Sequence, residues 1–440
     1  MARVPASGRH KSRRACCALS TKSDKSETSD PGLRRNTDFV LLASSRVVSQ
    51  LGDQLQFLAL PLLVVAITGS AAQAGLVLGA QTLVFLFFGV YAGVLVDRRD
   101  RKRTMIWCDV GRGVLTATVP IAYLGDFLTM PLLYVVAIGN GVLATLFSAA
   151  NSSALPNIVS RTQLPSALGA LGAISNTLRI AGASVAGILY SLGRMIPFAL
   201  NAVSFLLSAI SLRFISARFQ ESEAARQPAK GPAATLADIR EGLSWLWGRR
   251  VIRTLAFLDA GDALRYGIGY LLIITLAQRL DATATQVGIV FTGAAAGALL
   301  GNLLAPKLTT RFPLGRLSIS TLWIEALAFP FYAIAPTWWL LLFVAFAESV
   351  ISPVYNVALD TYRLGQTPDA MRGRVTSSVD TLVGGAAAIG TAVGGVAIDA
   401  FGPVQLTFVL TAWLVLLAVI ATTSRTLRST SVVASEVAAD

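Results

Sequence analysis

Long apolar segments separated by short polar ones occupy most of this chain. Twelve of these segments have about the 20 residues that an α-helix needs to cross the hydrocarbon core of a bilayer. They lie at residues 39–67, 74–96, 104–124, 130–153, 165–192, 195–214, 252–277, 285–308, 315–335, 338–362, 375–400 and 404–423. The longest polar interruption falls between the sixth and the seventh. The pattern therefore predicts an all-α membrane protein with twelve transmembrane helices in two six-helix bundles.

The polar stretches divide the chain into five parts. We expect a disordered cytoplasmic tail at 1–38, because this segment is rich in Lys, Arg, Ser and Asp. The other parts are an N-terminal bundle at 39–215, a cytoplasmic linker at 216–250, a C-terminal bundle at 251–424 and a cytoplasmic tail at 425–440.

The linker contains one amphipathic segment at residues 235–247. Its apolar positions recur at helical spacing, at Leu236, Ile239, Leu243 and Leu246. This spacing predicts a helix that lies on the inner membrane surface, with Trp245 and Trp247 near the lipid headgroups. An ordinary soluble linker helix is the alternative.

Basic residues concentrate in alternate connections between the predicted spans. One set, which includes the loop at 97–103 and the linker, carries almost all of the loop cations, whereas the other holds only Arg194 and Arg279. Lys and Arg concentrate on the cytoplasmic side of membrane proteins, so both termini should be cytoplasmic in a multi-pass protein of the cell membrane. The net charge of +13 has this origin. Nucleic acid is not an expected partner, because basic patches with interleaved aromatic residues are absent from the sequence.

The two halves share short sequence matches. Leu-Gly-Asp at 51–53 matches Ala-Gly-Asp at 260–262, and Ala-Gln-Ala-Gly at 72–75 matches Thr-Gln-Val-Gly at 285–288. The matches occur in the same order in both halves. Repeated halves with polar positions inside their spans are typical of secondary transporters.

The loop at 93–103 reads Gly-Val-Leu-Val-Asp-Arg-Arg-Asp-Arg-Lys-Arg between two apolar spans. It resembles the loop 2–3 motif of the major facilitator superfamily. Arg46, the segments 51–53 and 60–62, and the pair Asp109 and Arg112 are similar to the macrolide-efflux and siderophore-exporter type of drug:proton antiporters within that superfamily. The resemblance implies the major facilitator fold, with two pseudo-symmetric bundles around a central cavity.

The resemblance also implies a gating role for the loop. Asp97 is expected to cap the start of the eleventh span, near residues 374–377, when the protein is open to the outside. Arg98 and Arg101 would add contacts between the halves. The gating motif consists of Gly93, Asp97, Arg98, Arg101 and Lys102. The alternative is that these charges only set the topology.

Charged residues inside a span cost about 2.5–3.5 kcal/mol each on insertion scales, so they require a functional or structural reason. In the first span Arg46, Asp53 and Gln56 share one helical face, and in the seventh Asp259, Asp262 and Tyr266 do the same. Because lipid excludes such faces, both should line a common cavity. The substrate-cavity candidates are Arg46, Gln56, Arg179, Asp259, Arg265, Tyr266 and Tyr355.

Three carboxylates inside the spans, Asp53, Asp262 and Glu348, are candidates for proton coupling. For Asp53 the alternative is a structural ion pair with Arg46 or Arg179, and for Asp262 one with Arg265. Glu325 fits a structural role facing the bundle. We interpret Asp109 and Arg112 as a structural pair close to the loop at 93–103.

The sequence argues against catalysis. His10 is the only histidine, it lies in the tail, and neither a Gly-x-Ser-x-Gly elbow nor a phosphate-binding Gly-Lys-Ser/Thr loop occurs. The cysteines have no metal-ligand spacing, so we expect neither a metal, a cofactor nor enzyme activity.

The leading hypothesis is a monomeric, proton-coupled exporter of an amphipathic organic compound, such as a drug, macrolide or siderophore-like molecule. It would work by alternating access. Metabolite uptake by the same fold, or a non-transporting receptor or scaffold, are the alternatives.

Overall fold

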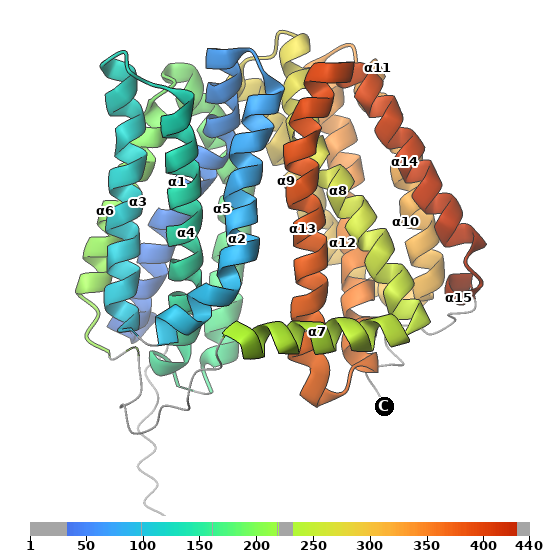
Figure 1. The fold of residues 1–440 in the computed structure, drawn as a ribbon, viewed down its shortest axis with the longest axis horizontal. Coiled ribbons are helices and arrows are strands. Elements are labelled where there is room, and N and C mark those ends of the chain that lie inside the picture. Colours follow the sequence, from blue (N-terminus) through green and yellow to red (C-terminus); the bar gives the residue numbers. More distant parts are fainter. Residues whose placement is uncertain (1–32, 98, 161, 218, 220–231, 429–440) are drawn as a thin grey trace, which may run out of the picture.

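Helices account for all regular structure in the part of the chain that the computed structural model describes, residues 33–97, 99–160, 162–217, 219 and 232–428 (Figure 1). Most of both predicted tails and the start of the linker lie outside these residues. The first group of long helices is α1 (Thr37–Thr68), α2 (Ala71–Asp97), α3 (Arg101–Leu124), α4 (Met130–Ala154), α5 (Leu164–Leu192) and α6 (Ile196–Arg213). Two short 3-10 helices accompany them, η1 (Leu33–Arg35) and η2 (Leu155–Asn157).

The second group follows the linker helix α7 (Pro232–Gly248). It comprises α8 (Arg250–Arg279), α9 (Ala284–Arg311), α10 (Leu314–Ala328), α11 (Pro330–Ile334), α12 (Trp338–Gln366), α13 (Asp369–Phe401), α14 (Pro403–Thr423) and α15 (Arg425–Arg428). One predicted span, at 315–335, is divided into α10 and α11. The break falls at Pro330, which has no N–H to continue the helical hydrogen bonding.

The helices confirm the predicted all-α membrane fold. Within the described residues, ten spans are long and apolar enough to cross a membrane, with α10 and α11 counted as one. Two further helices, α3 and α5, have 24 and 29 residues and pack among the ten. Charges at the start and in the middle of α3 lower its hydropathy. Twelve crossings are therefore consistent with the structure.

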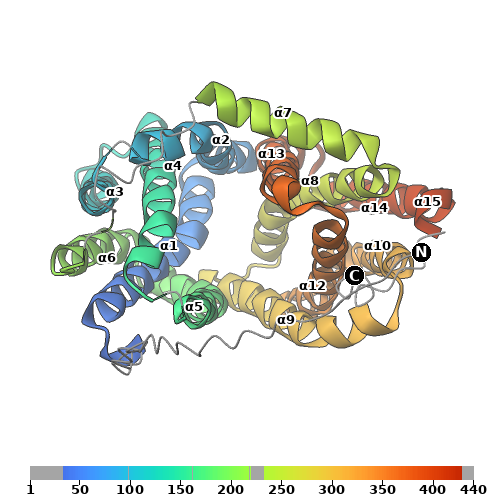
Figure 2. The ribbon, with the colours of Figure 1, turned by 90° about the horizontal axis from the view of Figure 1, so that it is seen from below.

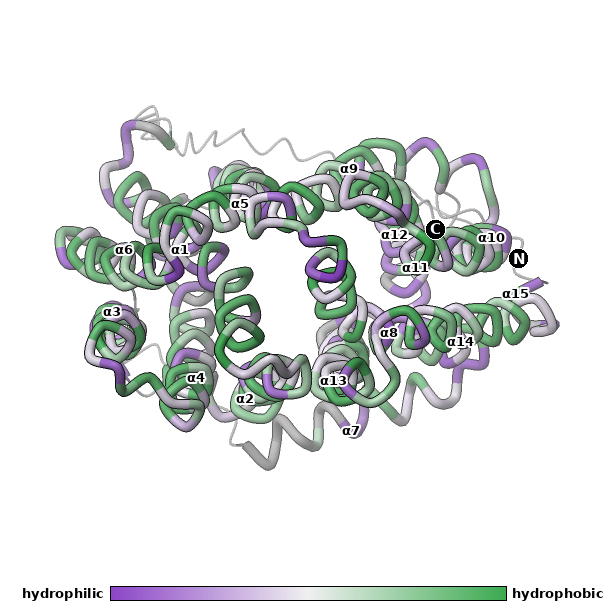
Figure 3. The backbone as a smooth tube through the Cα atoms, turned by 90° about the horizontal axis from the view of Figure 1, so that it is seen from above, coloured by the Kyte–Doolittle hydropathy of each residue, from purple (hydrophilic) through white to green (hydrophobic). Residues whose placement is uncertain are grey.

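The helices of each group pack mainly with one another. In the first group α1 lies against α5 and α6, α3 lies against α4 and α6, and α2 lies against α4. In the second group α12 packs on α9, α13 on α8 and α14 on α10. Two helix pairs make the most extensive contacts between the groups, α2 with α13 and α5 with α9, and these four helices border the centre of the molecule in Figure 3.

The helix α7 runs across the lower end of the molecule in Figure 1, which we call the linker side and which faces the viewer in Figure 2; the opposite end is the far side. It packs on α13 and α8. Leu246 is fully buried there, and Glu241 forms an ion pair with Arg374 of α13 at 2.8 Å. Trp247 is exposed and meets Phe257 edge to face at 5.4 Å. The predicted helix therefore exists, but Leu246 on its apolar side docks on the protein.

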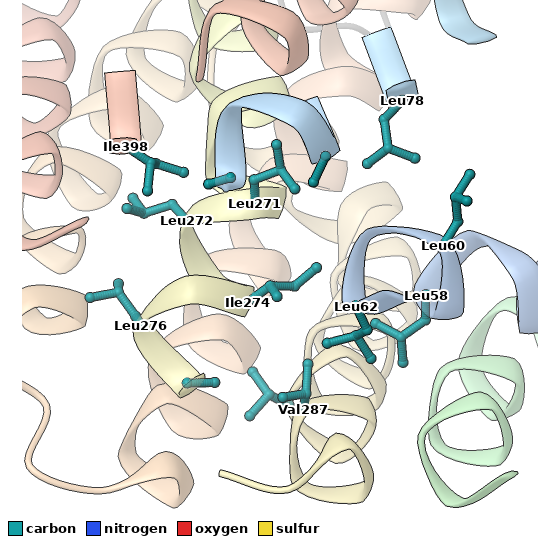
Figure 4. Packing of buried hydrophobic residues seen from close by; sticks show 14 of the residues in the cluster. Leu58, Leu60, Leu62, Leu78, Leu271, Leu272, Ile274, Leu276, Val287 and Ile398 are labelled. Carbon is teal, nitrogen blue, oxygen red and sulfur yellow. The ribbon is translucent and has the colours of Figure 1, made fainter. Parts of the chain in front are cut away.

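The two groups join on the far side and separate on the linker side. One apolar cluster on the far side contains residues of both groups, including Leu58 and Leu62 of α1 and Leu271 and Ile274 of α8 (Figure 4). The linker side has two clusters instead, each confined to one group and its adjoining segments.

Glycines allow the close approach on the far side. A Cβ on Gly395 of α13 would overlap the backbone of α2 at Ala71, and a Cβ on Gly187 of α5 would overlap the backbone of α9 at Ala284. Larger residues at either glycine would force the helices of the two groups apart.

Candidate functional site

Arg265 of α8 lies at the centre of three carboxylates from three helices. Its Nε donates to Asp262 on the same helix at 2.7 Å, and its Nη1 donates to Glu348 of α12 at 2.5 Å. Its Nη2 lies 3.9 Å from Glu325 of α10. Only 4% of the Arg265 side chain is exposed. The guanidinium also lies over the Phe329 ring, 5.2 Å from its centroid.

This cluster has more negative than positive groups. One guanidinium faces three carboxylates, and a buried charge without a partner is strongly unfavourable. Tyr332 donates a hydrogen bond to the second oxygen of Glu348 at 2.8 Å. The excess of negative charge in this cluster would fall if one of the three carboxyl groups carried a proton.

A pocket adjoins the cluster. It encloses about 580 Å³ of empty space, counting the part open to solvent. Its wall combines Arg265 and Glu348 with five aromatic residues, Tyr266, Tyr270, Phe291, Phe329 and Tyr332. Apolar walls with a few charged groups are typical of small-molecule sites.

Aromatic contacts link this pocket to the first group of helices. The Tyr270 ring lies 4.8 Å from both Phe57 of α1 and Phe291 of α9, measured between centroids. The Tyr270 hydroxyl donates to the backbone oxygen of Phe57 at 3.1 Å. The pocket is therefore bounded by a contact that joins the two groups of helices.

Asp53 of α1 pairs with Arg112 of α3, at 2.5 Å from Nη2. The aspartate side chain is 39% exposed, whereas Arg112 is buried and lies over the Phe205 ring at 4.0 Å. The sequence predicted Arg46 or Arg179 as the structural partner of Asp53, and this prediction is wrong. The expected pair of Asp109 with Arg112 is also absent from the contacts of these described residues, because Arg112 turns toward α1.

Gln56 lies inside the first bundle, not at the cavity wall where we expected it. Only 6% of the residue is exposed. Its side-chain oxygen accepts hydrogen bonds from Asn201 of α6 at 2.6 Å and Thr116 of α3 at 3.4 Å. Gln56 lies about one helical turn after Asp53 and faces α6. The two residues are therefore on the same side of α1, but Asp53 is partly exposed whereas Gln56 is buried in the bundle.

The other predicted cavity residues vary in exposure. Tyr266 is 69% exposed and Arg179 is exposed, while Arg46 and Asp259 are half-buried. The Tyr355 hydroxyl is buried and has no hydrogen-bond partner among the described residues.

The loop motif is described only in part. Arg98 lies outside the described residues, as do the surroundings of Gly93 and Asp97, although α2 continues to Asp97. Arg101 donates to the backbone oxygen of Phe219 at 3.3 Å, and Lys102 donates to those of Ile215 and Arg213 at 2.5 and 3.0 Å. These two cations hold the segment that follows α6.

Sequence reasoning missed the carboxylate that closes the far side. Asp399, near the end of α13, accepts hydrogen bonds from the Ser70 hydroxyl at 2.6 Å and from the backbone N–H groups of Ala71 and Ala72 at 2.9 and 3.0 Å. It thus caps the N-terminus of α2. In the other helix pair, Ser191 of α5 accepts from the N–H of Thr285, in the first turn of α9, at 3.2 Å. The sequence signal for this cap was a single carboxylate, Asp399, near the end of the predicted span at 375–400.

A family model described as a transmembrane secretion effector matches residues 31–439. The chain belongs to this family of the major facilitator superfamily. The resemblance of the loop at 93–103 is therefore confirmed. As a member of this superfamily, the protein is a multi-pass membrane transporter.

Two relatives illustrate its place in the superfamily. The multidrug efflux pump Tap of Mycobacterium tuberculosis is 28% identical over 381 residues, which cover 84% of this chain and 88% of Tap. The uncharacterized MFS-type transporter YfiS of Bacillus subtilis is 29% identical over 220 residues, 49% of this chain and 51% of YfiS.

Solved structures share the fold of this superfamily member. The nucleoside transporter NupG aligns with a TM-score of 0.68 at 14% identity, over 87% of this chain and 98% of NupG. A bacterial homologue of the human lysosomal transporter Spinster, in an inward-facing and unoccupied conformation, aligns with a TM-score of 0.69 at 16% identity, over 91% of this chain and 99% of that one. At these identities the likeness concerns the fold alone.

Proposed function

We propose that this protein is a proton-coupled exporter of amphipathic organic compounds that works by alternating access. One observation carries the proposal: three carboxylates share the single guanidinium of Arg265 at the wall of an aromatic pocket. Proton binding and the binding of a largely apolar molecule are thus supported at one place. The likeness to Tap, which is named a multidrug efflux pump, supports drug-like substrates and export.

The orientation follows from charge. The linker side carries the loop at 97–103, α7 and both chain ends of the described segment, and its connections hold most of the loop cations. The positive-inside rule then assigns this side, with both termini, to the cytoplasm of the cell membrane. Since the two groups of helices separate on the linker side, the structure corresponds to the cytoplasm-open state. One chain supplies the whole pocket, so we propose that a monomer is sufficient.

Glu348 couples the proton to the substrate. It accepts hydrogen bonds from Arg265 and Tyr332 and also lines the pocket. A proton on Glu348 removes its charge and weakens its bond to Arg265. The pocket then has a different charge and shape when Glu348 or its neighbour Asp262 is protonated. If the proton and the substrate compete for the pocket, each binds only when the other has left, and the inward movement of protons is coupled to the outward movement of substrate.

Alternating access requires the far-side contacts to break. The cap formed by Asp399 on α2 and the contact of Ser191 with α9 both join the two groups. When they open, the linker side must close. We propose that Asp97 then caps the start of α13, as the family motif implies, close to Arg374.

The test is transport in everted membrane vesicles, in which the cytoplasmic side faces the medium. Acidifying the lumen should drive accumulation of a fluorescent lipophilic drug, and an uncoupler should stop it. Glu348→Gln should reduce proton-driven accumulation by more than about 100-fold, since a group that exchanges the proton is lost. Asp262→Asn should have the same direction of effect.

Asp360→Asn is the matched control. Asp360 is on the same helix as Glu348, but its side chain is 56% exposed and pairs with Arg363. Asparagine keeps an oxygen that can accept the hydrogen bond of Arg363, so accumulation should stay within about twofold of the wild type. Accumulation that persists with the uncoupler present would refute proton coupling. Full activity of Glu348→Gln would refute the assigned site.

A further inference from the structure

Asp109 is a second buried carboxylate in the first bundle, one turn before Arg112 on α3. It is 0% exposed. The Ser208 hydroxyl of α6 donates to its Oδ2 at 2.5 Å, and Ser208 in turn lies 3.0 Å from the Ser45 hydroxyl of α1. Its Oδ1 is buried and has no hydrogen-bond partner within the described part of the chain.

No cation among the described residues forms an ion pair with this carboxylate, although the charge of Arg112 acts on it through space. Arg112, three residues along the same helix, is engaged with Asp53. The neighbouring helix α4 carries no charged residue, and α6 carries only Arg213 in its last turn. On α1, whose Ser45 bonds Ser208, Arg46 is half-buried and forms no ion pair with Asp109 among the described residues. The remaining titratable groups near Asp109 are Cys108 and the Asp53 carboxylate itself. An ionised Asp109 would thus be a buried charge without an ion pair, which is strongly unfavourable.

Arg112 has spare capacity for a second partner. Its Nη2 binds Asp53, but its Nε is buried and has no hydrogen-bond partner among the described residues. Residues three apart lie on the same face of a helix, so the guanidinium of Arg112 can reach the Asp109 carboxylate by a change of side-chain rotamer. Oδ1 of Asp109 has no hydrogen-bond partner among the described residues, so it can accept from Arg112 once Asp109 has lost its proton.

We propose that Asp109 is a proton carrier of the first bundle and that Arg112 alternates between Asp53 and Asp109. In the state shown, Arg112 pairs with ionised Asp53, and Asp109 holds a proton. When Asp53, which is open to solvent, takes up a proton, its bond to Arg112 breaks. Arg112 then pairs with Asp109. The Ser208 hydroxyl turns to accept the Asp109 proton and donates its own proton to Ser45, so that one proton leaves along the two hydroxyls. The trio of Asp53, Arg112 and Asp109 carries no net charge in either state, so neither leaves an uncompensated charge in the bundle.

This inference rests on the proposed proton coupling, but its first test does not. Infrared difference spectra of the purified protein at neutral pH should show the C=O stretch of a protonated carboxylic acid that disappears in Asp109→Asn. Ser208→Ala should shift this band, because the hydroxyl that bonds the carboxyl is gone. Ser211→Ala is the matched control, since Ser211 is also on α6 but bonds Ser44. If wild type and Asp109→Asn have the same band, Asp109 is ionised and the proposal is wrong.

The second test separates proton movement from substrate movement. Asp109→Asn should lower proton-driven drug accumulation by more than about tenfold, because the cycle loses a proton-exchanging group. Exchange of labelled for unlabelled drug across the membrane, which needs no net proton movement, should stay within about twofold. Asp109 has only a structural role if Asp109→Asn reduces accumulation and exchange equally and if Ser208→Ala leaves the pH dependence of accumulation unchanged. If the wild type lacks proton coupling, the proposed function fails, while the infrared result still decides the protonation of Asp109.

Discussion

At the scale of single residues, Arg265 determines whether the charged cluster is stable. It bonds carboxylates from α8 and α12 and lies near a third from α10, so one side chain connects three helices. Arginine suits this position because its planar fork offers several donors in fixed directions. Removing it would leave Asp262, Glu325 and Glu348 together with no cation between them.

Arg265→Leu should therefore lower the free energy of unfolding by about 3–5 kcal/mol, the usual cost of breaking a buried ion pair from one side. Arg265→Lys should recover only part of the loss, since an ammonium cannot donate to three carboxylates in these directions. Thermal unfolding in detergent measures both. Arg311→Leu, at an exposed position on α9, should change the stability by less than about 0.5 kcal/mol. An unchanged melting temperature for Arg265→Leu would contradict the ion cluster.

The same residues show what sequence can predict. The spacing of Asp259, Asp262 and Tyr266 placed them on one helical face, and Glu348 was recognised as a charge in the middle of a span. Helical spacing does not say which neighbouring helix that face meets. For this reason the sequence did not predict that Asp53 pairs with Arg112 and not with Arg46 or Arg179. Nor did it predict that Glu325 lies in the cluster around Arg265.

At the scale of helices, two pairs decide which side is closed. Asp399 of α13 bonds the N-terminus of α2, and Ser191 of α5 bonds the first turn of α9. A helix N-terminus carries partial positive charge, so the carboxylate makes the stronger of the two contacts. Helix bounds were predictable because each apolar run ends at polar or Gly/Pro residues. The division at Pro330 and the docking of α7 depend on tertiary packing, which hydropathy does not report.

Asp399→Ala should shift the protein toward the far-side-open state by about 2 kcal/mol, since it removes a charged acceptor from a helix N-terminus. Ser191→Ala should shift it by about 1 kcal/mol, since the two hydrogen bonds that Ser191 accepts from the N–H and the hydroxyl of Thr285 are neutral. Spin labels at Thr129 and Thr337, at the far-side starts of α4 and α12, measure the distance between the two groups of helices on the far side. The fraction of molecules with a long distance between the labels reports the population of the far-side-open state. An unaltered distance distribution for Asp399→Ala would show that this cap does not hold the gate.

At the scale of the whole molecule, the apolar core is divided unevenly. One cluster on the far side includes residues of both bundles, while the linker side has a separate cluster for each. Each bundle thus keeps its own core on the linker side and can move as a unit. The far-side cluster, in contrast, must lose its contacts between bundles whenever that side opens. Transport should therefore require α5 and α9 to separate along their line of contact, which we call the α5–α9 seam.

A reversible cross-link tests this dependence. The hydroxyls of Ser184 on α5 and Thr292 on α9 lie 2.6 Å apart across the seam, so cysteines at both positions are close enough for a disulfide. In a background with Cys16 and Cys17 replaced by serine, oxidation of the Ser184→Cys, Thr292→Cys double variant should stop transport, and a reductant should restore it. A variant with only one of these two substitutions should be insensitive to the oxidant, because the remaining native cysteine, Cys108, is buried. Drug binding from the linker side should survive oxidation, because the pocket stays accessible while only the far side is locked. Continued turnover with the disulfide formed would mean that the bundles need not separate at this seam, and alternating access would then have to open the far side elsewhere.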